Sequence, residues 1–435
     1  MKIHSLDAYP VFDSRGNPTI ECEATLADGT RGLGVVPSGA STGQYEALEL
    51  RDNDPRRFRG RSVFQAIENI QTRLAPAVVG MDVEDQRAVD LRMIQVDGTP
   101  NKSALGANAI LAVSMAVAAA AANHRRQPLH QSLGEGRGTL LPLPEIQIIG
   151  GGAHANWRTD IQDFLLIATG AQSFAEVMEI TFNVYHACGD LLKQRRRYYG
   201  LADEGGYWPE FDSNEEALTL LVEAINRAGY TPGVEASIAL DIAASDLFDP
   251  STGRYRLELD QCELNSHEFV DRMIDWCERY PVISIEDPAA DTDVAGWQRF
   301  QAALGHRVQV VGDDLFTTNP ARIREGIAHR LANAVLIKLN QIGTVTETLD
   351  AIRLTQAAGW LPVISARSGE TEDAFISHLA VATNAGQLKV GSFARSERMV
   401  KWNEVIRIER QLGNRARFIG KGIYAPLANG KTGSS

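Results

Sequence analysis

The N-terminal part of the chain alternates polar and apolar residues in short steps and then changes to helical spacing. The stretch "TIECEATLADGTRGLGVVPSG" (19–39) has a period of two on both sides of a central Asp-Gly pair, which is typical of an antiparallel hairpin. Helical segments follow, among them residues 62–79 and the alanine-rich residues 105–123. We therefore predict a small α+β cap domain over residues 1–135.

A second pattern begins near residue 235, where short β-branched runs alternate with amphipathic helical windows. The runs, in order, are "SIALDIA", "VISIEDP", "VQVVGDD", "AVLIKLN", "LPVISAR" and "QLKVGS". Strand and helix repeating at this pitch predict a parallel sheet, and so many units in one stretch favour a closed barrel. A segment with several glycines and prolines, 133–147, separates the two patterns. We expect an α/β fold in which a β/α barrel, residues 142–430, carries the active site.

Composition and charge narrow the classes of function. With 435 residues, of which 44% are hydrophobic and 23% charged, the chain is an ordinary globular protein that can bury a large core. Its net charge of -12 repels polyanions, so we expect no nucleic-acid partner. The basic stretch "KQRRRYY" (193–199) leaves two interpretations open: base stacking on its tyrosines, or a solvated helix end or subunit contact.

Three features bear on the cellular compartment. The four cysteines are far apart and form no CxxC pair, so neither a disulfide framework nor a zinc site is indicated. The N-terminus lacks the apolar region of a secretory signal. Residues 105–123 approach membrane-spanning length, but they are mostly alanine and are interrupted by Asn108 and Ser114. We expect a cytoplasmic protein that does not contact a membrane.

Ionisable residues fall at the same place in successive strand-helix repeats. They lie inside or at the carboxyl end of the predicted strands: Asp241, Glu286, Asp313, Lys338, Arg367 and Lys389. Barrel enzymes assemble their active sites at this end of the strands. One such acid alone could equally cap the next helix. Three acids on neighbouring strands together with two lysines would need a ligand, so the pattern predicts one charged mouth.

The residue types at this mouth indicate a reaction class. Three carboxylates suit a hard cation, Mg²⁺ first and Mn²⁺ second. Lys338 interrupts an apolar run, where burial disfavours its charged form. A metal dication and Lys389 nearby would favour the neutral amine, which is a competent general base, and an ion pair with a neighbouring carboxylate is the alternative. A base beside a metal-bound carboxylate indicates abstraction of a proton alpha to that carboxylate.

Two glycine-rich loops are suited to binding anions. The loop "VPSGASTG" (36–43) of the cap domain is expected to be mobile, with hydroxyls and amides that could close over an anion or ligate a second cation. The loop "ISARSGETED" (364–373) places Arg367 and Ser368 at a strand end, where a guanidinium and a hydroxyl suit a phosphate. Either loop by itself could also be an ordinary turn.

Along almost its whole length the chain resembles the enolases, the Mg²⁺-dependent phosphopyruvate hydratases. The matching motifs are "DSRGNPT" (13–19), "VPSGASTG", "GGGAH" (150–154), "DEGG" (203–206), "LDIAASD" (240–246), "SIEDP", "GDDLFTTNP" (312–320), "IKLNQIGT", "RSGETED" and "ARSERMVKWNE" (394–404). A lysine base with Mg²⁺ is the established arrangement of that superfamily. The resemblance implies a lyase with an α+β cap on an eight-stranded barrel, usually a homodimer or higher homo-oligomer, acting on a small phosphorylated or phosphonate carboxylic acid.

The resemblance also carries roles over to single residues. It implies two Mg²⁺ ions per active site, the first held by Asp241, Glu286 and Asp313 and the second by Ser41 of the mobile loop. Lys338 matches the base, and Glu204 matches the acid that helps the hydroxide leave. The substrate binders are Arg367 and Ser368 at the phosphate, Lys389 at the carboxylate, and His154 near the phosphate.

Three positions depart from the family pattern. Where the family has "SHRSGETED", with the histidine beside the leaving hydroxyl, this chain has Ala366. The family's "QEF" is "QDF" here, so Asp163 is one methylene shorter than the glutamate that pairs with Glu204. "HAGN" has become "HANW", which is expected to place Trp157 next to the mouth. All three positions map to the hydroxyl end of the substrate, so proton abstraction should survive while substrate identity could change.

Three functions therefore remain open. The first is a hydro-lyase acting on 2-phosphoglycerate. The second is a related enzyme with a bulkier substrate, for example one forming carboxyphosphonoenolpyruvate in phosphonate or phosphinate antibiotic biosynthesis. The third, supported only by the missing histidine, is a catalytically weak enolase-like binding protein.

Overall fold

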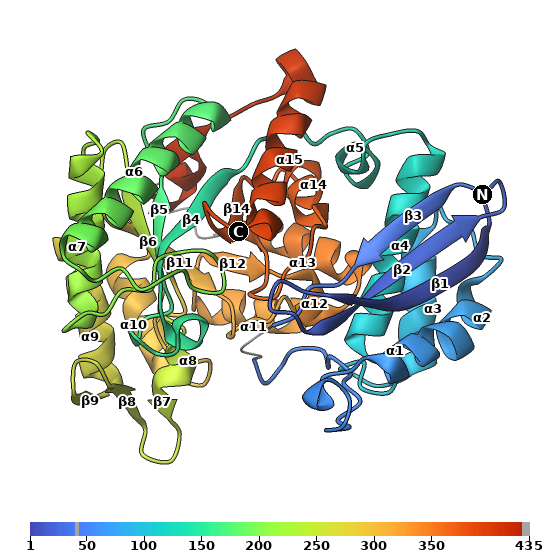
Figure 1. Cartoon of the computed structure of the whole chain (residues 1–435), viewed down its shortest axis with the longest axis horizontal. Coiled ribbons are helices and arrows are strands. Elements are labelled where there is room, and N and C mark those ends of the chain that lie inside the picture. The colour runs from blue at the N-terminus through green and yellow to red at the C-terminus, as the bar shows by residue number, and fades with distance from the viewer. Residues whose placement is uncertain (40–42, 429–435) are drawn as a thin grey trace.

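The cap domain packs one long helix against a small antiparallel sheet. The computed structural model describes residues 1–39 and 43–428. In the sheet, β2 (Pro18–Leu26) pairs with both β1 (Ile3–Phe12) and β3 (Arg31–Val35), as the alternating pattern predicted. Helix α4 (Ala107–His124) lies across β2 and β3 (Figure 1).

Small residues allow this close approach of helix and sheet. A Cβ atom on Gly32 would lie 2.0 Å from the backbone nitrogen of Ala120, and one on Gly34 would lie 2.5 Å from the carbonyl oxygen of Ala112. By length and composition α4 is apolar enough to cross a membrane, but 83% of it is buried inside the protein. Its alanine content therefore serves packing at the centre of the cap domain.

Shorter helices complete the cap domain around α4. They are η1 (Phe58–Gly60), α1 (Phe64–Asn69), η2 (Ile70–Leu74), α2 (Ala75–Val78), α3 (Gln86–Asp97) and α5 (Leu129–Leu133). Helix α3 begins at Asp85, whose side chain accepts the Ala88 backbone N–H, and ends at Gly98 in the left-handed conformation. Both residues are the usual types at these two positions.

Within the described residues, eight strands close into a barrel. They are β4 (Leu143–Gly150), β5 (Asp163–Ile167), β6 (Ser237–Asp241), β10 (Val282–Glu286), β11 (Gln309–Gly312), β12 (Ala334–Ile337), β13 (Leu361–Ser365) and β14 (Gln387–Ser392). The sequence predicted a parallel sheet, but β5 runs antiparallel to both β4 and β6. The reason is the connection 151–162, which holds only the short helix η3 (Gly152–Ala155) and no crossover helix, so the chain turns directly back.

Helices surround the barrel (Figure 1). They are α6 (Phe174–Gln194), α7 (Asn214–Arg227), α9 (Ser266–Arg279), α10 (Val294–Leu304), α11 (Pro320–His329), α13 (Val345–Ala357), α14 (Phe375–Ala382) and α15 (Ser396–Leu412). Several begin at a polar cap: Ser173, Asn265 and Thr344 each accept a backbone N–H three residues on. These caps fix where each strand-helix loop ends, and hence the shape of the barrel mouth.

Short elements fill the remaining connections of the barrel domain. They are α8 (Ala244–Leu247), β7 (Phe248–Asp249), β8 (Arg254–Leu257), β9 (Cys262–Asn265), α12 (Leu339–Ile342), η4 (Gly413–Arg415), η5 (Gly420–Tyr424) and α16 (Ala425–Ala428). β7, β8 and β9 form a separate antiparallel sheet beside the barrel.

The cap domain touches the barrel at its carboxyl-terminal end. Ser38 and Gly369 exchange two backbone hydrogen bonds of 2.8 and 2.9 Å, and the Ala47 N–H donates to the carbonyl of Gln341. A Cβ atom on Gly369 would lie 2.4 Å from the Ser38 hydroxyl oxygen, so only glycine fits there. The loop after β13 and the loop after β3 are thereby held face to face over the barrel mouth.

Candidate active site at the barrel mouth

The ionisable residues predicted at strand ends do come together at the barrel mouth. Asp241 and Glu286 are the last residues of β6 and β10, Asp313 and Lys338 directly follow β11 and β12, and Lys389 lies within β14. Arg367 lies two residues beyond β13. Apart from Glu286, all of them line one cavity of about 440 Å³, including its opening.

Lys389 pairs with two of the three acids. Its Nζ lies 2.7 Å from Asp241 Oδ2 and 2.7 Å from Glu286 Oε2, and all three residues are buried. Burial raises the pKa of Asp241, but Lys389 outweighs it and holds that pKa at about 2. Burial and the charge of Asp241 raise the pKa of Glu286 well above its usual value. One ammonium group is therefore too little positive charge for this pair of carboxylates.

Lys338 pairs with the third acid, Asp313, with 2.5 Å between Nζ and Oδ2. Burial lowers the pKa of Lys338, but the Asp313 carboxylate outweighs burial and raises that pKa above its usual value. The neutral amine expected from the sequence is thus not the form that these residues alone favour. Lys389 does act in the predicted direction by lowering the pKa, but it is weaker than Asp313.

These three acids fit a hard cation. Their donors are all carboxylate oxygens, which Mg²⁺ and Mn²⁺ prefer. Glu286 Oε1 is buried and has no hydrogen-bond partner in the described part of the chain. Since the positive charges that contact the three carboxylates come from two lysines, a dication would satisfy both the free oxygen and the excess negative charge. Ser41, the predicted ligand of a second ion, lies outside the described residues, as do residues 40–42 of the predicted mobile loop.

Asp287 and Asp314 extend the acidic set beyond the predicted ligands. Carboxylate oxygens of Asp287, Asp313 and Asp314 lie within 4.8 Å of one another. Asp287 accepts the backbone N–H groups of Asp313 and Asp314, each at 2.9 Å, so it fixes the loop after β11. Asp287 directly follows the predicted ligand Glu286 in "IEDP". This adjacency is the sequence feature that could have identified Asp287 as part of the site.

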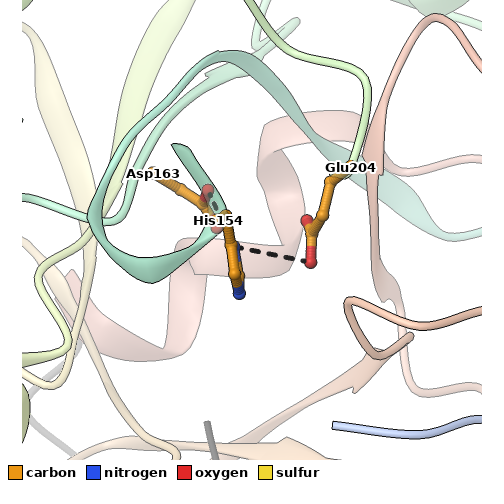
Figure 2. A group of neighbouring side chains, drawn as sticks. All are labelled: His154, Asp163 and Glu204. Atoms are coloured by element: carbon orange, nitrogen blue, oxygen red, sulfur yellow. Dashed lines mark ion pairs between the residues drawn. The ribbon is translucent and has the colours of Figure 1, made fainter. Parts of the chain in front are cut away.

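The cavity is also lined by His154, Asp163 and Glu204, and Asp163 Oδ2 lies 3.7 Å from Lys389 Nζ. Figure 2 shows the three side chains converging, with His154 Nδ1 3.9 Å from Asp163 Oδ1 and 3.8 Å from Glu204 Oε1. Burial and the negative charge of Asp163 raise the pKa of Glu204. Burial lowers the pKa of His154, but the two acids outweigh it and raise that pKa. Glu204 is therefore the acid of this group suited to carry a proton.

The predicted phosphate binders contact groups that the sequence did not indicate. Arg367 Nη1 lies 2.9 Å from Glu46 Oε2 of the cap domain and donates to Asn340 Oδ1 at 2.9 Å. The guanidinium of fully buried Arg398 donates to the carbonyl oxygens of Arg367 and Ser368, each at 2.6 Å. Arg398 lies in the quoted motif "ARSERMVKWNE", whereas Glu46 meets Arg367 only through docking of the two domains.

Two of the three departures from the family pattern lie in the cavity. Ala366 is buried and lines it, and so does Asp163. The Trp157 side chain is 49% exposed and is not one of the described residues that line the cavity, so its place next to the mouth stays a prediction. Asn156 and Trp157 both have positive φ after η3.

The basic stretch 193–199 lies at the end of α6 and is largely neutralised within the chain. Arg195 pairs with Glu223, and Arg197 pairs with Asp212 and Glu216. Lys193 contacts Asp190 at 3.8 Å. Such pairing supports the solvated helix end, because paired guanidinium groups are poor partners for a phosphate backbone.

Comparison with known proteins gives one family over both domains. Residues 3–133 match the model "Enolase, N-terminal domain", and residues 138–427 match "Enolase, C-terminal TIM barrel domain". Enolase 1 of Desulfitobacterium hafniense is 56% identical over 425 residues, covering 98% of this chain and 97% of that protein. Enolase of Acidothermus cellulolyticus is 50% identical over 431 residues, covering 99% of each. This chain belongs to the enolase family of hydro-lyases.

Proposed function

We propose that the chain is an Mg²⁺-dependent hydro-lyase that removes the proton alpha to the carboxylate of 2-phosphoglycerate, or of a close phospho or phosphono analogue, and eliminates the β-hydroxyl. One observation carries this proposal. Lys338, paired with one of three buried carboxylates, lines the same cavity as Glu204, a buried acid with a raised pKa. A base and an acid in one cavity suit elimination across one carbon-carbon bond.

Asp241, Glu286 and Asp313 would hold the first Mg²⁺, with Mn²⁺ as a substitute, and Ser41 would help to hold a second ion. When bound, the metal supplies positive charge that stabilises the dianion formed as the alpha proton leaves. The chain's own contribution is to place Lys338 beside this site. A cation held by Asp313 would compete with Lys338 for that carboxylate, which is the main group that raises the pKa of Lys338.

In the reaction, Lys338 Nζ accepts the alpha proton, and the electron pair of the broken C–H bond moves toward the substrate carboxylate. The pair then forms the carbon-carbon double bond as the β carbon-oxygen bond breaks. Glu204 donates its proton to the departing hydroxide, so the products are water and an enolpyruvate. Lys338 has gained one proton and Glu204 has lost one, and exchange with solvent restores both residues.

The remaining cavity residues would bind the two anionic groups of the substrate. Lys389 would contact the carboxylate, while Arg367, Ser368 and His154 would contact the phosphate. Glu46 now pairs with Arg367 at 2.9 Å. A phosphate at Arg367 would therefore displace the Glu46 carboxylate, which belongs to the cap domain.

Ala366 and Asp163 favour a second substrate candidate. The methyl group of Ala366 lines the cavity where the family has an imidazole, and Asp163 is shorter than the family's glutamate. A phosphonate carboxylic acid with a bulkier group at the hydroxyl end fits the space that these two residues leave. Such a substrate would give carboxyphosphonoenolpyruvate or a related product.

One assay separates the two substrates. The purified enzyme with Mg²⁺ is mixed with 2-phosphoglycerate in D₂O, and proton NMR follows both loss of the alpha proton signal and appearance of the enol product. We expect exchange of the alpha proton with little dehydration. Robust dehydration would make 2-phosphoglycerate the substrate, and absence of both exchange and dehydration would refute this substrate.

We further infer a cytoplasmic homodimer. Tyr9 of β1 and Leu33 of β3 are 42% and 47% exposed on the outer face of the cap sheet, and apolar side chains grouped on one face support self-association. Sedimentation equilibrium would give a dimer mass, and a monomer mass at micromolar concentration would contradict this inference.

A further inference from the structure

Gln147 of β4 connects the two acids at the elimination end of the cavity. Its side chain is fully buried. Its Nε2 donates to Asp163 Oδ1 on the neighbouring strand β5, and its Oε1 accepts the Gly206 backbone N–H at 2.8 Å. Gly206 lies two residues after Glu204. One side chain thus spans from the carboxylate of Asp163 to the loop that carries Glu204.

Two glycines make room for a side chain of this length. A Cβ atom on Gly206 would lie 2.5 Å from Gln147 Oε1, and a Cβ atom on Gly150 would lie 3.2 Å from Gln147 Nε2. The amide is therefore enclosed on both sides by bare backbone. It has no room to move aside for a longer residue at position 163, because Asp163 is itself only 1% exposed.

The loop that carries Glu204 is held by several backbone hydrogen bonds, in which the N–H groups of Ala202 and Asp203 donate to the carbonyls of Gly206 and His154. The carbonyl of Glu204 accepts the Ser392 N–H at 2.9 Å, and Gly205 has a positive φ of 96°, which lets the chain reverse directly after the acid. The Gly205 N–H donates back to the carbonyl of Ala202, and the Gly206 N–H is received by the Gln147 side chain. Gln147 therefore adds a direct link from the Asp163 carboxylate to this loop, two residues after Glu204.

We propose that Gln147 is a positioning residue for elimination and that Gln147 and Asp163 form a length-matched pair. This inference rests on the proposed function, since it assigns Asp163 and Glu204 to the hydroxyl end of the substrate. Shortening Gln147 to asparagine withdraws the amide from Asp163 and the Gly206 N–H. Lengthening Asp163 to glutamate pushes its carboxylate into the amide. Making both changes keeps the total length and restores the contact.

The test compares Gln147→Asn, Asp163→Glu and the double variant with the wild type on one substrate. Each is assayed for alpha-proton exchange in D₂O, which needs only the Lys338 end, and for dehydration, which needs both ends. We expect each single variant to lose at least tenfold in dehydration while exchange stays within about twofold, and the double variant to recover most of the loss. Gln309→Asn is the matched control, because Gln309 is an equally buried barrel glutamine whose side-chain amide makes no hydrogen bond within the described residues.

Two results would overturn the proposal. Equal losses of exchange and dehydration in Gln147→Asn would show a general structural role, and losses that add up in the double variant would show that the lengths are not matched. A crystal structure of Gln147→Asn gives a readout independent of turnover: the distances from His154 Nδ1 to Asp163 and Glu204, now 3.9 and 3.8 Å, should change. Unchanged distances would refute the positioning role even if the substrate assignment were wrong.

Discussion

The two ends of the cavity handle charge in different ways. At the base end, Lys338 and Lys389 lie 2.5 and 2.7 Å from the carboxylates that they neutralise. At the elimination end, His154 Nδ1 stands 3.8 and 3.9 Å from two acids and has no hydrogen-bond partner in the described structure. The lysines of the base end are held in direct ion pairs, whereas the imidazole of the elimination end contacts its two acids only at longer distances.

This difference agrees with where the chain departs from its family. Asp241, Glu286, Asp313, Lys338 and Lys389 all match the family pattern, while Ala366 and Asp163 at the elimination end do not. Every substrate of this reaction class has a carboxylate and an alpha proton, so the base end contacts the same chemical groups in each of them. The elimination end contacts the part of the substrate that can vary, and changes there are tolerated.

The largest effect is expected for Lys338→Ala. Because Lys338 is the amine that pairs with Asp313, alpha-proton exchange should fall by about 10²- to 10⁴-fold, the usual contribution of a general base. Mg²⁺ binding should stay near normal or tighten, since Asp313 loses its competing ammonium. Proton NMR in D₂O measures the exchange and calorimetry the metal binding. Exchange persisting at the wild-type rate would show that another residue is the base.

Glu286→Gln should weaken Mg²⁺ binding by at least about tenfold, since even residues behind the ligands commonly contribute 10- to 100-fold. The reason is the loss of one of three carboxylates and of its free Oε1. Glu145→Gln makes the same change at another buried acid of the barrel, on β4, and should leave the metal affinity little altered. A calorimetric titration unchanged in Glu286→Gln would remove this residue from the ligand set.

Dehydration, which needs Glu204, and alpha-proton exchange, which needs Lys338, should depend on pH in different ways. Glu204 must be protonated to donate, and its raised pKa keeps it protonated to higher pH than an ordinary glutamate. Dehydration should therefore decline as pH rises through that pKa, by about tenfold per unit above it, while exchange at the base end should not share this decline. Asp163→Asn removes the charge that helps to raise the pKa, so the decline should begin at lower pH. Identical pH profiles for exchange and dehydration would contradict the role of Glu204.

The base end and the barrel could be predicted from the sequence because both follow local rules. Polar residues at strand ends reach one mouth in any closed parallel barrel, which is why Asp241, Asp313 and Lys338 were found together. The division into cap and barrel could also be predicted, because the hydrophobic pattern changes from a period of two in the N-terminal part to strand-helix repeats after it. The antiparallel direction of β5 did not, because only the absence of a helix in 151–162 signals it.

The contacts that tune the site could not be predicted because they depend on docking between distant segments. Glu46 reaches Arg367 only when the cap domain sits on the barrel mouth. Gln147 meets Asp163 only because β5 is reversed beside β4. The ion pair of Lys338 with Asp313, which the sequence left open as the alternative to a neutral amine, likewise depends on a contact between separate strands.

The smallest effect, a gain, is expected from restoring the family pattern at the elimination end. Ala366→His with Asp163→Glu supplies the missing imidazole and the longer acid, but the methylene added at position 163 would press into Gln147. The triple variant that also carries Gln147→Asn should therefore dehydrate 2-phosphoglycerate about tenfold faster than wild type, and the double variant should gain less. Steady-state kinetics with saturating Mg²⁺ measure both. A double variant as fast as the triple would show that the elimination end adapts freely, and the contrast with the tightly paired base end would then fail.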